Sequence, residues 1–318
     1  MLEGYASATI IGGGVIGGSW AALFLAQGMS VCIHDPAPDI ESRVRAQLDT
    51  ALPDLEALGA VSTDRPIDRA NLPLRFERDL ARAVAGADVI QENGPEKIDF
   101  KRALWEEVER HAKADALFLS SSSGITATLQ SESMKNPERL VIGHPFTPPH
   151  ILPLVEVVPG TRRDPAIVAR VVAFYEALGK TVIVLRKEIR SFVGNRLQSA
   201  LFREAMHLVR EGVVTVDELD RVVTSSLGIR WAVAGPFQSF HLGGGPGGLR
   251  HFVETLGASM ERLWPQLGTA SFDETTNATL IEQADASFAK RSYTDLATAR
   301  DEAEIALVKL LSKRGDRS

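Results

Sequence analysis

The stretch that decides the fold is Ile10-Ile11-Gly12-Gly13-Gly14-Val15-Ile16-Gly17-Gly18. It places three glycines in the spacing G-x-G-x-x-G, between an apolar run and a helical run that follows it. Gly12 allows a tight turn from strand to helix, Gly14 lets the backbone approach a pyrophosphate, and Gly17 lets the helix pack closely on a sheet. The start of that helix then supplies amide groups that bind an anion. This stretch therefore predicts a dinucleotide-binding turn.

An acidic residue at the end of the next apolar run supports this interpretation. Asp35 follows Val31-Cys32-Ile33-His34. A carboxylate at that place accepts hydrogen bonds from both adenosine ribose hydroxyls and repels a 2′-phosphate, and the next residues include no arginine that would bind one. We therefore expect NAD rather than NADP as the cofactor. The alternative is an ordinary glycine turn followed by a surface aspartate.

Composition narrows the class of protein. The chain has 318 residues, enough for two domains, and a formal net charge of −6 with scattered basic residues, which argues against a nucleic-acid partner. No apolar run of about 18 residues and no leader sequence is found, so we expect no membrane partner. The one cysteine, Cys32, is expected in the core, which favours a reducing cytoplasm. We expect a small-molecule substrate and no metal.

The first part of the chain alternates short β-branched runs with helical stretches. This alternation predicts an α/β fold with a Rossmann-type, doubly wound, mostly parallel sheet over residues 1–188. A helix is expected from about Asp39 to Leu58, bent or broken at Pro53, followed by a surface loop from Gly59 to Pro73 that contains Pro66. The expected strands cover residues 8–12, 30–35, 74–76, 88–92, 116–120, 140–143, 154–158 and 181–185.

The second part, residues 189–318, shows helical periodicity and almost no strand signal. We expect an all-helical domain there, with helices over 192–211, 216–227 and 273–287. Thr215 and Asp217 are candidate N-caps, and Gly212 and Gly228 stand where C-caps belong. The stretch from Gly243 to Gly248 is expected to be a mobile loop or, less favoured, a place where backbones approach closely.

Four segments carry residues suited to chemistry: 120–124, 143–146, 154–158 and 192–196. Ser123 and His144 end two expected strands, and strand carboxyl ends face the ligand crevice of an open α/β sheet. Hydride transfer from an alcohol to NAD needs a group that removes the hydroxyl proton, and a neutral imidazole suits that task near pH 7. His144 is the candidate base. Glu156 is the candidate carboxylate that fixes its tautomer.

In this order and at these separations, the segments resemble the L-3-hydroxyacyl-CoA dehydrogenase family. The likeness runs from about Thr9 to about Phe252. Within the family, the stretches 144–160, 195–198 and 227–232 are similar to the branch that contains L-gulonate 3-dehydrogenase (lambda-crystallin) and carnitine dehydrogenase.

The resemblance implies roles for particular residues. His144 matches the family's catalytic base and Glu156 its partner, while Ser123 and Asn195 match the positions that hydrogen-bond the substrate oxygen, with Ser122 as an alternative to Ser123. It also implies a helical second domain that closes the substrate cleft and pairs subunits, hence a homodimer. The cofactor contacts implied by the glycine turn and by the family are Gly12, Gly14, Val15, Ile16, Gly17, Asp35, Glu96 and Lys101.

Two departures from the family pattern bear on the substrate. Thr147 stands where the acyl-CoA enzymes usually carry asparagine, and Ser121-Ser122 replaces Asn-Thr. The expected reaction is therefore NAD-dependent oxidation of the 3-hydroxyl of a small L-3-hydroxy acid, L-gulonate being favoured over an acyl-CoA thioester or carnitine. Arg230, or secondly Arg196, would bind the carboxylate of a free acid. A non-enzymatic NAD-binding protein is the alternative from another class.

Overall fold

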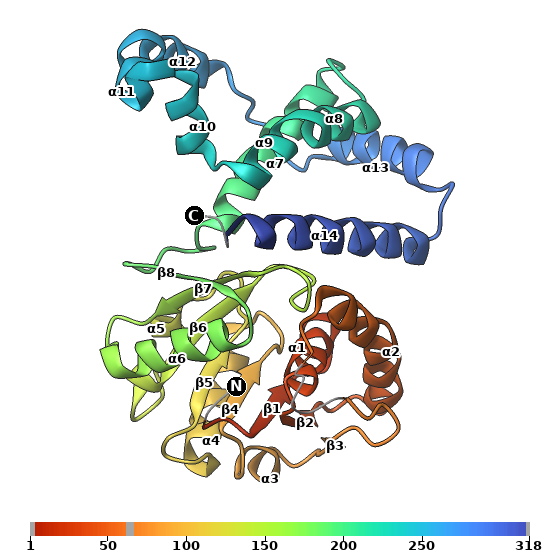
Figure 1. The fold of residues 1–318 in the computed structure, drawn as a ribbon, viewed down its shortest axis with the longest axis vertical. Coiled ribbons are helices and arrows are strands. Elements are labelled where there is room, and N and C mark those ends of the chain that lie inside the picture. Colours follow the sequence, from red (N-terminus) through yellow and green to blue (C-terminus); the bar gives the residue numbers. More distant parts are fainter. Residues whose placement is uncertain (1–3, 62–66, 316–318) are drawn as a thin grey trace. The chain divides into compact units, whose positions relative to one another are not determined.

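The computed structural model describes residues 4–61 and 67–315 and divides the chain into two compact units. One unit comprises residues up to Val193 together with those from Ala299 onward, and the other runs from Gly194 to Thr298. Figure 1 shows a sheet flanked by helices in the first unit and helices alone in the second. The predicted boundary between residues 188 and 189 stays a prediction. Pro66 lies outside the described residues.

The first unit is built on an eight-stranded sheet with the order β3-β2-β1-β4-β5-β6-β7-β8. All neighbouring strands are parallel except β6 and β7, which are antiparallel. The strand order reverses between β1 and β4, and ligands bind at such a switch point in open α/β sheets. The strands are β1 Ser7–Ile11, β2 Ser30–His34, β3 Leu74–Phe76, β4 Val89–Glu92, β5 Leu117–Ser120, β6 Leu140–Pro145, β7 Leu154–Pro159 and β8 Thr181–Val184.

Helices cover both faces of this sheet. On one face, α1 (Val15–Ala26), α2 (Ile40–Leu58) and α6 (Pro165–Ala177) share a core with alternate residues of the strands, including Ile10 and Val31. On the other, α3 (Leu80–Val84), α4 (Ile98–His111) and α5 (Ala127–Gln130) pack on residues such as Ile90 and Phe118. This layered arrangement confirms the predicted doubly wound, mostly parallel fold.

The second unit contains only helices among its described residues. Thr215 begins α8 with a capping box in which its hydroxyl accepts from the Glu218 amide. Asp273 caps α13 through the Thr276 amide. The helices from Gly194 onward are α7 Gly194–Arg210, α8 Val216–Val222, α9 Gly228–Val233, α10 Pro236–Gly243, α11 Gly248–Phe252, α12 Ala258–Leu263, α13 Glu274–Phe288 and α14 Tyr293–Gly315, with π-helical turns at Val223–Leu227 and Val253–Gly257. Most of α14, from Ala299 onward, belongs to the first unit.

Several local predictions were wrong, for identifiable reasons. Of the two effects predicted for Pro53, a bend or a break, the break is not observed, because α2 continues through the proline with buried residues on both sides of it. Gly228 ends no helix: its φ of −59° is right-handed, and the chain continues from a π-helical turn into α9. Asp217 lies in the first turn of α8 rather than at its cap, which is Thr215.

Two further differences concern glycines and a phenylalanine. A 3-10 turn at Gly245–Gly247 connects α10, which ends at Gly243, to α11, which begins at Gly248, and the predicted close approach of backbones is observed in this stretch. A Cβ on Gly244 would lie 2.0 Å from the Gly248 carbonyl oxygen, which leaves room only for glycine. Phe192 lies before α7, which begins at Gly194.

No helix in the described part of the chain has the length and apolar character that crossing a membrane requires.

Candidate active site

The glycine turn after β1 has the geometry that its sequence predicts. Gly12 adopts a φ of +86°, and a Cβ there would lie 2.8 Å from the Asn93 carbonyl oxygen. A Cβ on Gly17 would lie 1.9 Å from the Gly12 carbonyl oxygen, so α1 packs against the turn at a distance that only glycine permits. Gly14 instead faces open space, with nothing within 4 Å of an added Cβ. This clearance fits a pyrophosphate approaching the backbone.

The start of α1 is suited to bind an anion. Gly14 is its N-cap, and within the described residues no side chain caps this end and no acidic residue lies in its first turn. Val15 is 64% exposed, so the first turn of the helix meets solvent. Backbone amides at a helix start, together with the helix dipole, favour a phosphate group there. The residues present therefore fit the pyrophosphate of a dinucleotide.

Asp35 lies just beyond the end of β2 and is held by two backbone amides. Its Oδ2 accepts from the Gly13 amide at 2.9 Å, and its Oδ1 accepts from the Ala37 amide at 2.9 Å. These bonds join the carboxylate to the glycine turn itself. The acidic group is thus fixed next to the anion-binding helix start, where the ribose of a dinucleotide would lie.

A buried ion pair lies at the carboxyl end of β4. Lys101 on α4 is 1% exposed, and its Nζ donates to both carboxylate oxygens of Glu92 at 2.7 and 2.8 Å. Glu92 also accepts from the Ser120 hydroxyl at 2.5 Å and from the Gly94 amide at 2.7 Å. These partners lie on α4, at the carboxyl end of β5 and just after β4. The pair therefore ties the end of β4 to β5 and α4.

Glu96 connects this pair to the serine run after β5. Its Oε1 accepts from the Ser122 hydroxyl at 2.5 Å and from the amides of Gly124 and Ile125, and its Oε2 lies 3.4 Å from Lys101 Nζ. Partial burial opposes ionisation, but the bonds from Ser122 and the amides, together with Lys101, lower the pKa of Glu96 below its ordinary value. Glu96 is therefore a carboxylate that orders the 122–125 turn.

This arrangement bears on the choice between two serines. Ser122 is buried, and its hydroxyl is engaged by Glu96 and by the backbone of Ile125. Ser123 is exposed at the carboxyl end of β5. Both serines keep their predicted role in substrate contact as alternatives, with Ser123 the more accessible of the two.

His144 and Glu156 stand opposite each other on the antiparallel pair β6 and β7. The His144 Nδ1 lies 2.9 Å from Glu156 Oε2, and the two side chains are 5% and 3% exposed. Cross-strand neighbours on one face of a sheet lie close enough to make this contact without bending the backbone. The contact fixes which ring nitrogen faces the carboxylate, and the role of His144 as a base stays a prediction.

Two aromatic rings and one amide surround this pair. Phe146 and Phe192 have their ring centroids 5.5 and 5.4 Å from that of His144. The Val193 amide donates to Glu156 Oε1 at 2.9 Å, so each carboxylate oxygen has a defined contact. Phe146 is half-buried whereas Phe192 is fully buried.

The remaining predicted site residues lie in the second unit. Asn195 is in the first turn of α7 and half-buried, and Arg196 next to it is exposed. Arg230 is exposed on α9. The structure thus brings together His144 with Glu156, and Glu96 with Lys101, within the first unit. The three residues of the second unit keep their predicted roles as proposals.

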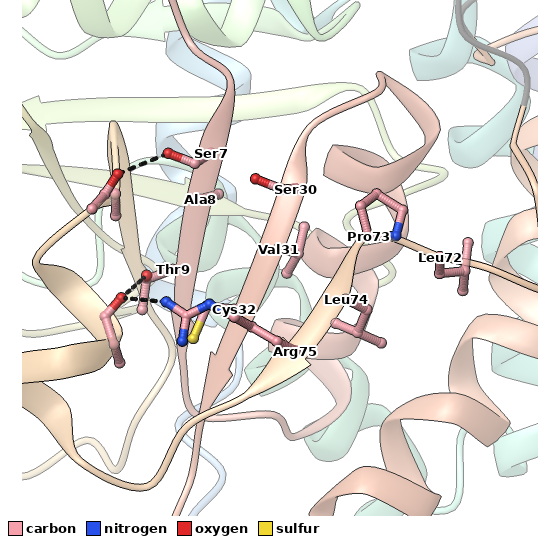
Figure 2. Close-up of a pocket in the computed structure, with 13 residues that line it drawn as sticks. Ser7, Ala8, Thr9, Ser30, Val31, Cys32, Leu72, Pro73, Leu74 and Arg75 are labelled. Atoms are coloured by element: carbon pink, nitrogen blue, oxygen red, sulfur yellow. Dashed lines mark hydrogen bonds between the residues drawn. The ribbon is translucent and has the colours of Figure 1, made fainter.

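A cavity of about 500 Å³ lies elsewhere in the first unit, against the amino-terminal halves of β1 and β2 and beside β3 and α3 (Figure 2). Arg75 points into it next to the Cys32 sulfur, and burial raises the pKa of that thiol although Arg75 opposes the effect. None of the candidate site residues lines this cavity. Among the described residues, no three His, Cys, Asp or Glu side chains gather as metal ligands would.

Sequence reasoning missed three contributors to these contacts. Glu92 ends β4 at the switch point, and a charged residue at the carboxyl end of a buried strand is the signal that could have found it. Phe192 and Val193 belong to a segment that stood out in the sequence, but no pattern there predicts that their ring and amide reach the His144–Glu156 pair.

Comparison with family models matches both parts of the chain. Residues 7–189 match the model described as 3-hydroxyacyl-CoA dehydrogenase, NAD binding domain, and residues 192–278 match 3-hydroxyacyl-CoA dehydrogenase, C-terminal domain. The chain is 40% identical to the L-carnitine dehydrogenase of Nocardiopsis dassonvillei over 98% of its own length and 93% of that protein's. It is also 40% identical to the L-carnitine dehydrogenase of Streptomyces coelicolor, over 96% of this chain and 94% of the relative.

Solved structures show the same fold over nearly the whole chain. The structure of 5-formyl-3-hydroxy-2-methylpyridine 4-carboxylic acid 5-dehydrogenase, described as an NAD⁺-dependent dismutase, superposes with a TM-score of 0.81 at 28% identity, covering 97% of this chain and 99% of its own. FadB2 of M. tuberculosis superposes with a TM-score of 0.65 at 25% identity, covering 89% of this chain and 94% of its own.

Proposed function

Because this chain belongs to the 3-hydroxyacyl-CoA dehydrogenase family and is an NAD-dependent dehydrogenase, we propose that its substrate is L-carnitine, oxidised at the 3-hydroxyl to the 3-keto acid. The observation that carries the proposed chemistry is the buried contact of 2.9 Å between His144 and Glu156. The names of relatives that align over nearly their full lengths support the substrate. L-Gulonate and an acyl-CoA thioester are the competing substrates.

In the proposed reaction His144 Nε2 removes the proton of the substrate hydroxyl. Glu156 stabilises the imidazolium that forms and keeps Nδ1 protonated. Ser123 and Asn195 hydrogen-bond the substrate oxygen. Bound NAD would supply the hydride acceptor: the carbon that bears the hydroxyl would lose one hydride and the hydroxyl one proton, which converts the alcohol into a ketone.

For the cofactor, we propose that the turn at Gly12, Gly14 and Gly17 holds the pyrophosphate with the amides of Val15 and Ile16. Asp35 would bind the adenosine ribose. Glu96 would contribute near the nicotinamide end through the turn that it orders, and Lys101 through its contact of 3.4 Å with Glu96. Lys101 would thus act indirectly, since its side chain is 1% exposed.

The trimethylammonium group of L-carnitine is bonded to the carbon next to the reacting one. A cation in that place must lie near His144, and the half-buried Phe146 ring is adjacent to the imidazole at 5.5 Å between centroids. Aromatic faces attract quaternary ammonium groups. We assign the cation to Phe146 and the carboxylate to Arg230, with Arg196 as the second candidate.

The test is the initial rate of NADH formation with L-carnitine, L-gulonate and L-3-hydroxybutyryl-CoA, for the native protein and for His144→Ala. We expect turnover of L-carnitine, lost by roughly two to four orders of magnitude in His144→Ala because the base is gone. His111→Ala, which removes an exposed histidine on α4, is the matched control and should keep full activity. Preference for L-gulonate or the thioester would refute L-carnitine as the substrate. NAD binding without any turnover would favour the non-enzymatic alternative.

Two variants resolve the substrate contacts in the same assay. Arg230→Ala should raise KM for the free acid by roughly ten- to a hundredfold, because a hydrogen bond to a charged group contributes about 1.5–3 kcal/mol. Phe146→Leu should raise KM for L-carnitine more than KM for a 3-hydroxy acid of similar size that lacks the ammonium group. Equal increases in KM for both substrates would refute the assignment of the cation to Phe146.

We also propose that the protein is a cytoplasmic homodimer. Large apolar side chains of the second unit are exposed in the single chain, among them Leu197 at 63%, Phe237 at 78% and Phe272 at 70%. Exposed apolar groups of this size are typical of surfaces that pair. Light scattering coupled to size-exclusion chromatography should give twice the mass of one chain, and a monomer mass would refute the dimer.

A further inference from the structure

The segment that follows β8 contains two consecutive residues with left-handed backbones. Ser191 has a φ of +63° and Phe192 a φ of +51°, and neither is glycine. L-residues rarely adopt this region, and where they do, the surrounding contacts hold them there. Such residues concentrate at functional sites, so the contacts of this segment call for a functional explanation.

Phe192 and Val193 both contact the His144–Glu156 pair. The Phe192 side chain is fully buried, and its ring lies 5.4 Å from the imidazole at an interplanar angle of 54°. The next amide along the chain, that of Val193, donates to Glu156 Oε1 at 2.9 Å. The ring packs on the base while the amide holds the carboxylate that faces it.

The segment is anchored before it reaches these contacts. The Leu185 amide donates to the Val157 carbonyl at 2.9 Å and continues the pairing with β7. Glu188 accepts from the Thr128 amide at 2.9 Å and from its hydroxyl at 2.6 Å. Glu156 also lies on β7. The start of this segment is therefore fixed to the same strand whose carboxylate the segment contacts at Val193.

We propose that Phe192 and Val193 form a positioning element that sets the orientation of Glu156 and of the His144 ring. The left-handed backbone at 191 and 192 turns the ring and the next amide toward the same pair. Gly194, which begins the second unit, follows directly. This inference rests on the proposed role of His144 as the base.

Physical reasons support both contacts. A carboxylate with one oxygen held by an amide cannot rotate freely, so its other oxygen stays on the line of His144 Nδ1. Because the Val193 amide donates to Oε1, Oε2 is the carboxylate oxygen that faces the imidazole. The buried ring restricts rotation of the imidazole and keeps water away from the pair. A small misplacement of a base is enough to slow proton transfer by about a hundredfold.

The first experiment compares Phe192→Leu and Phe192→Ala with Phe174→Leu, which removes the same atoms from a buried ring packed in the core of the opposite sheet face. We expect kcat to fall about tenfold in Phe192→Leu and about a hundredfold in Phe192→Ala, with KM for NAD and substrate nearly unchanged. Phe174→Leu should lower the melting temperature to a similar extent while it keeps kcat. Equal losses of kcat in Phe192→Leu and Phe174→Leu would overturn the proposal.

The second experiment needs no turnover and so separates this inference from the proposed function. In protein labelled with ¹⁵N-histidine, the proton bridging His144 Nδ1 and Glu156 is assigned as the downfield NMR signal that His144→Ala removes. Replacing the Val193 amide by an ester, with the α-hydroxy acid of valine, deletes one N–H and keeps the side chain. We expect that signal to broaden or vanish in the ester variant and in Phe192→Ala. An unchanged signal in both would refute the positioning role, even if the native enzyme oxidises L-carnitine.

Discussion

Asp35, the proposed ribose ligand, is hydrogen-bonded to the glycine turn. Its two oxygens accept from the amides of Gly13 and Ala37, so its removal would leave two donors at the place where a 2′-phosphate would lie. We expect Asp35→Ser to lower kcat/KM for NAD by about ten- to a hundredfold, because the ribose loses a charge-assisted acceptor. The preference for NAD over NADP should fall by a larger factor, because the repulsion between the Asp35 carboxylate and the 2′-phosphate also disappears.

The assay is kcat/KM for NAD and NADP with the same alcohol substrate. Asp39→Ser is the matched control, since it removes an exposed carboxylate at the start of α2 and keeps a residue that caps helices well. In Asp39→Ser, the ratio of kcat/KM for NAD to kcat/KM for NADP should equal that of the native protein. If Asp35→Ser retains the native ratio, Asp35 does not select the cofactor.

At the scale of elements, the Glu92–Lys101 pair links β4, β5 and α4 through one buried cluster. Breaking a buried ion pair leaves an uncompensated charge, which costs about 3–5 kcal/mol, whereas replacing both partners costs much less. We expect Lys101→Met to lower the free energy of unfolding by about that amount. The double variant Glu92→Gln/Lys101→Met should be clearly milder, since the amide oxygen still accepts from Gly94 or Ser120 without a charge. Urea unfolding of both variants measures this, and equal losses would show that no charge is stranded.

How far the sequence predicts these elements depends on where the information lies. Apolar runs and glycine spacing are local signals, so β1, β3 and the cap at Thr215 lie within a residue of their predicted places. The contact between His144 and Glu156 could be predicted because the expected chemistry and the family resemblance both pair a histidine with a carboxylate. The contacts of Glu92 and Phe192 arise only when distant segments pack, which no local pattern encodes. Likewise, the continuity of α2 through Pro53 is decided by core packing that outweighs a local preference.

At the scale of the whole molecule, folding stability should depend on pH through one buried lysine. Lys180 is 8% exposed, and its ammonium donates to the carbonyl oxygens of Pro149 and Leu152 in the loop between His144 and Glu156. No carboxylate forms an ion pair with it in the described part of the chain, and burial lowers its pKa to about 7. Its neighbour His150, held by Ser19 and Asp54, also has its pKa lowered by burial.

The sign of the effect follows from proton binding. Between about pH 7 and about pH 10.5, the unfolded chain keeps a proton on Lys180 that the native chain has released, so this residue makes the free energy of unfolding rise with pH by about 1.4 kcal/mol per unit. Lys180→Met should lose this contribution. Between about pH 7.5 and about pH 9.5, we expect the free energy of unfolding of the native protein to rise by about 3 kcal/mol relative to that of Lys180→Met. Urea unfolding measures this difference. Lys187→Met, at an exposed position, is the control. If the difference between native protein and Lys180→Met stays constant over this range, Lys180 remains charged in the folded state, and the loop between His144 and Glu156 is held by an ammonium group throughout.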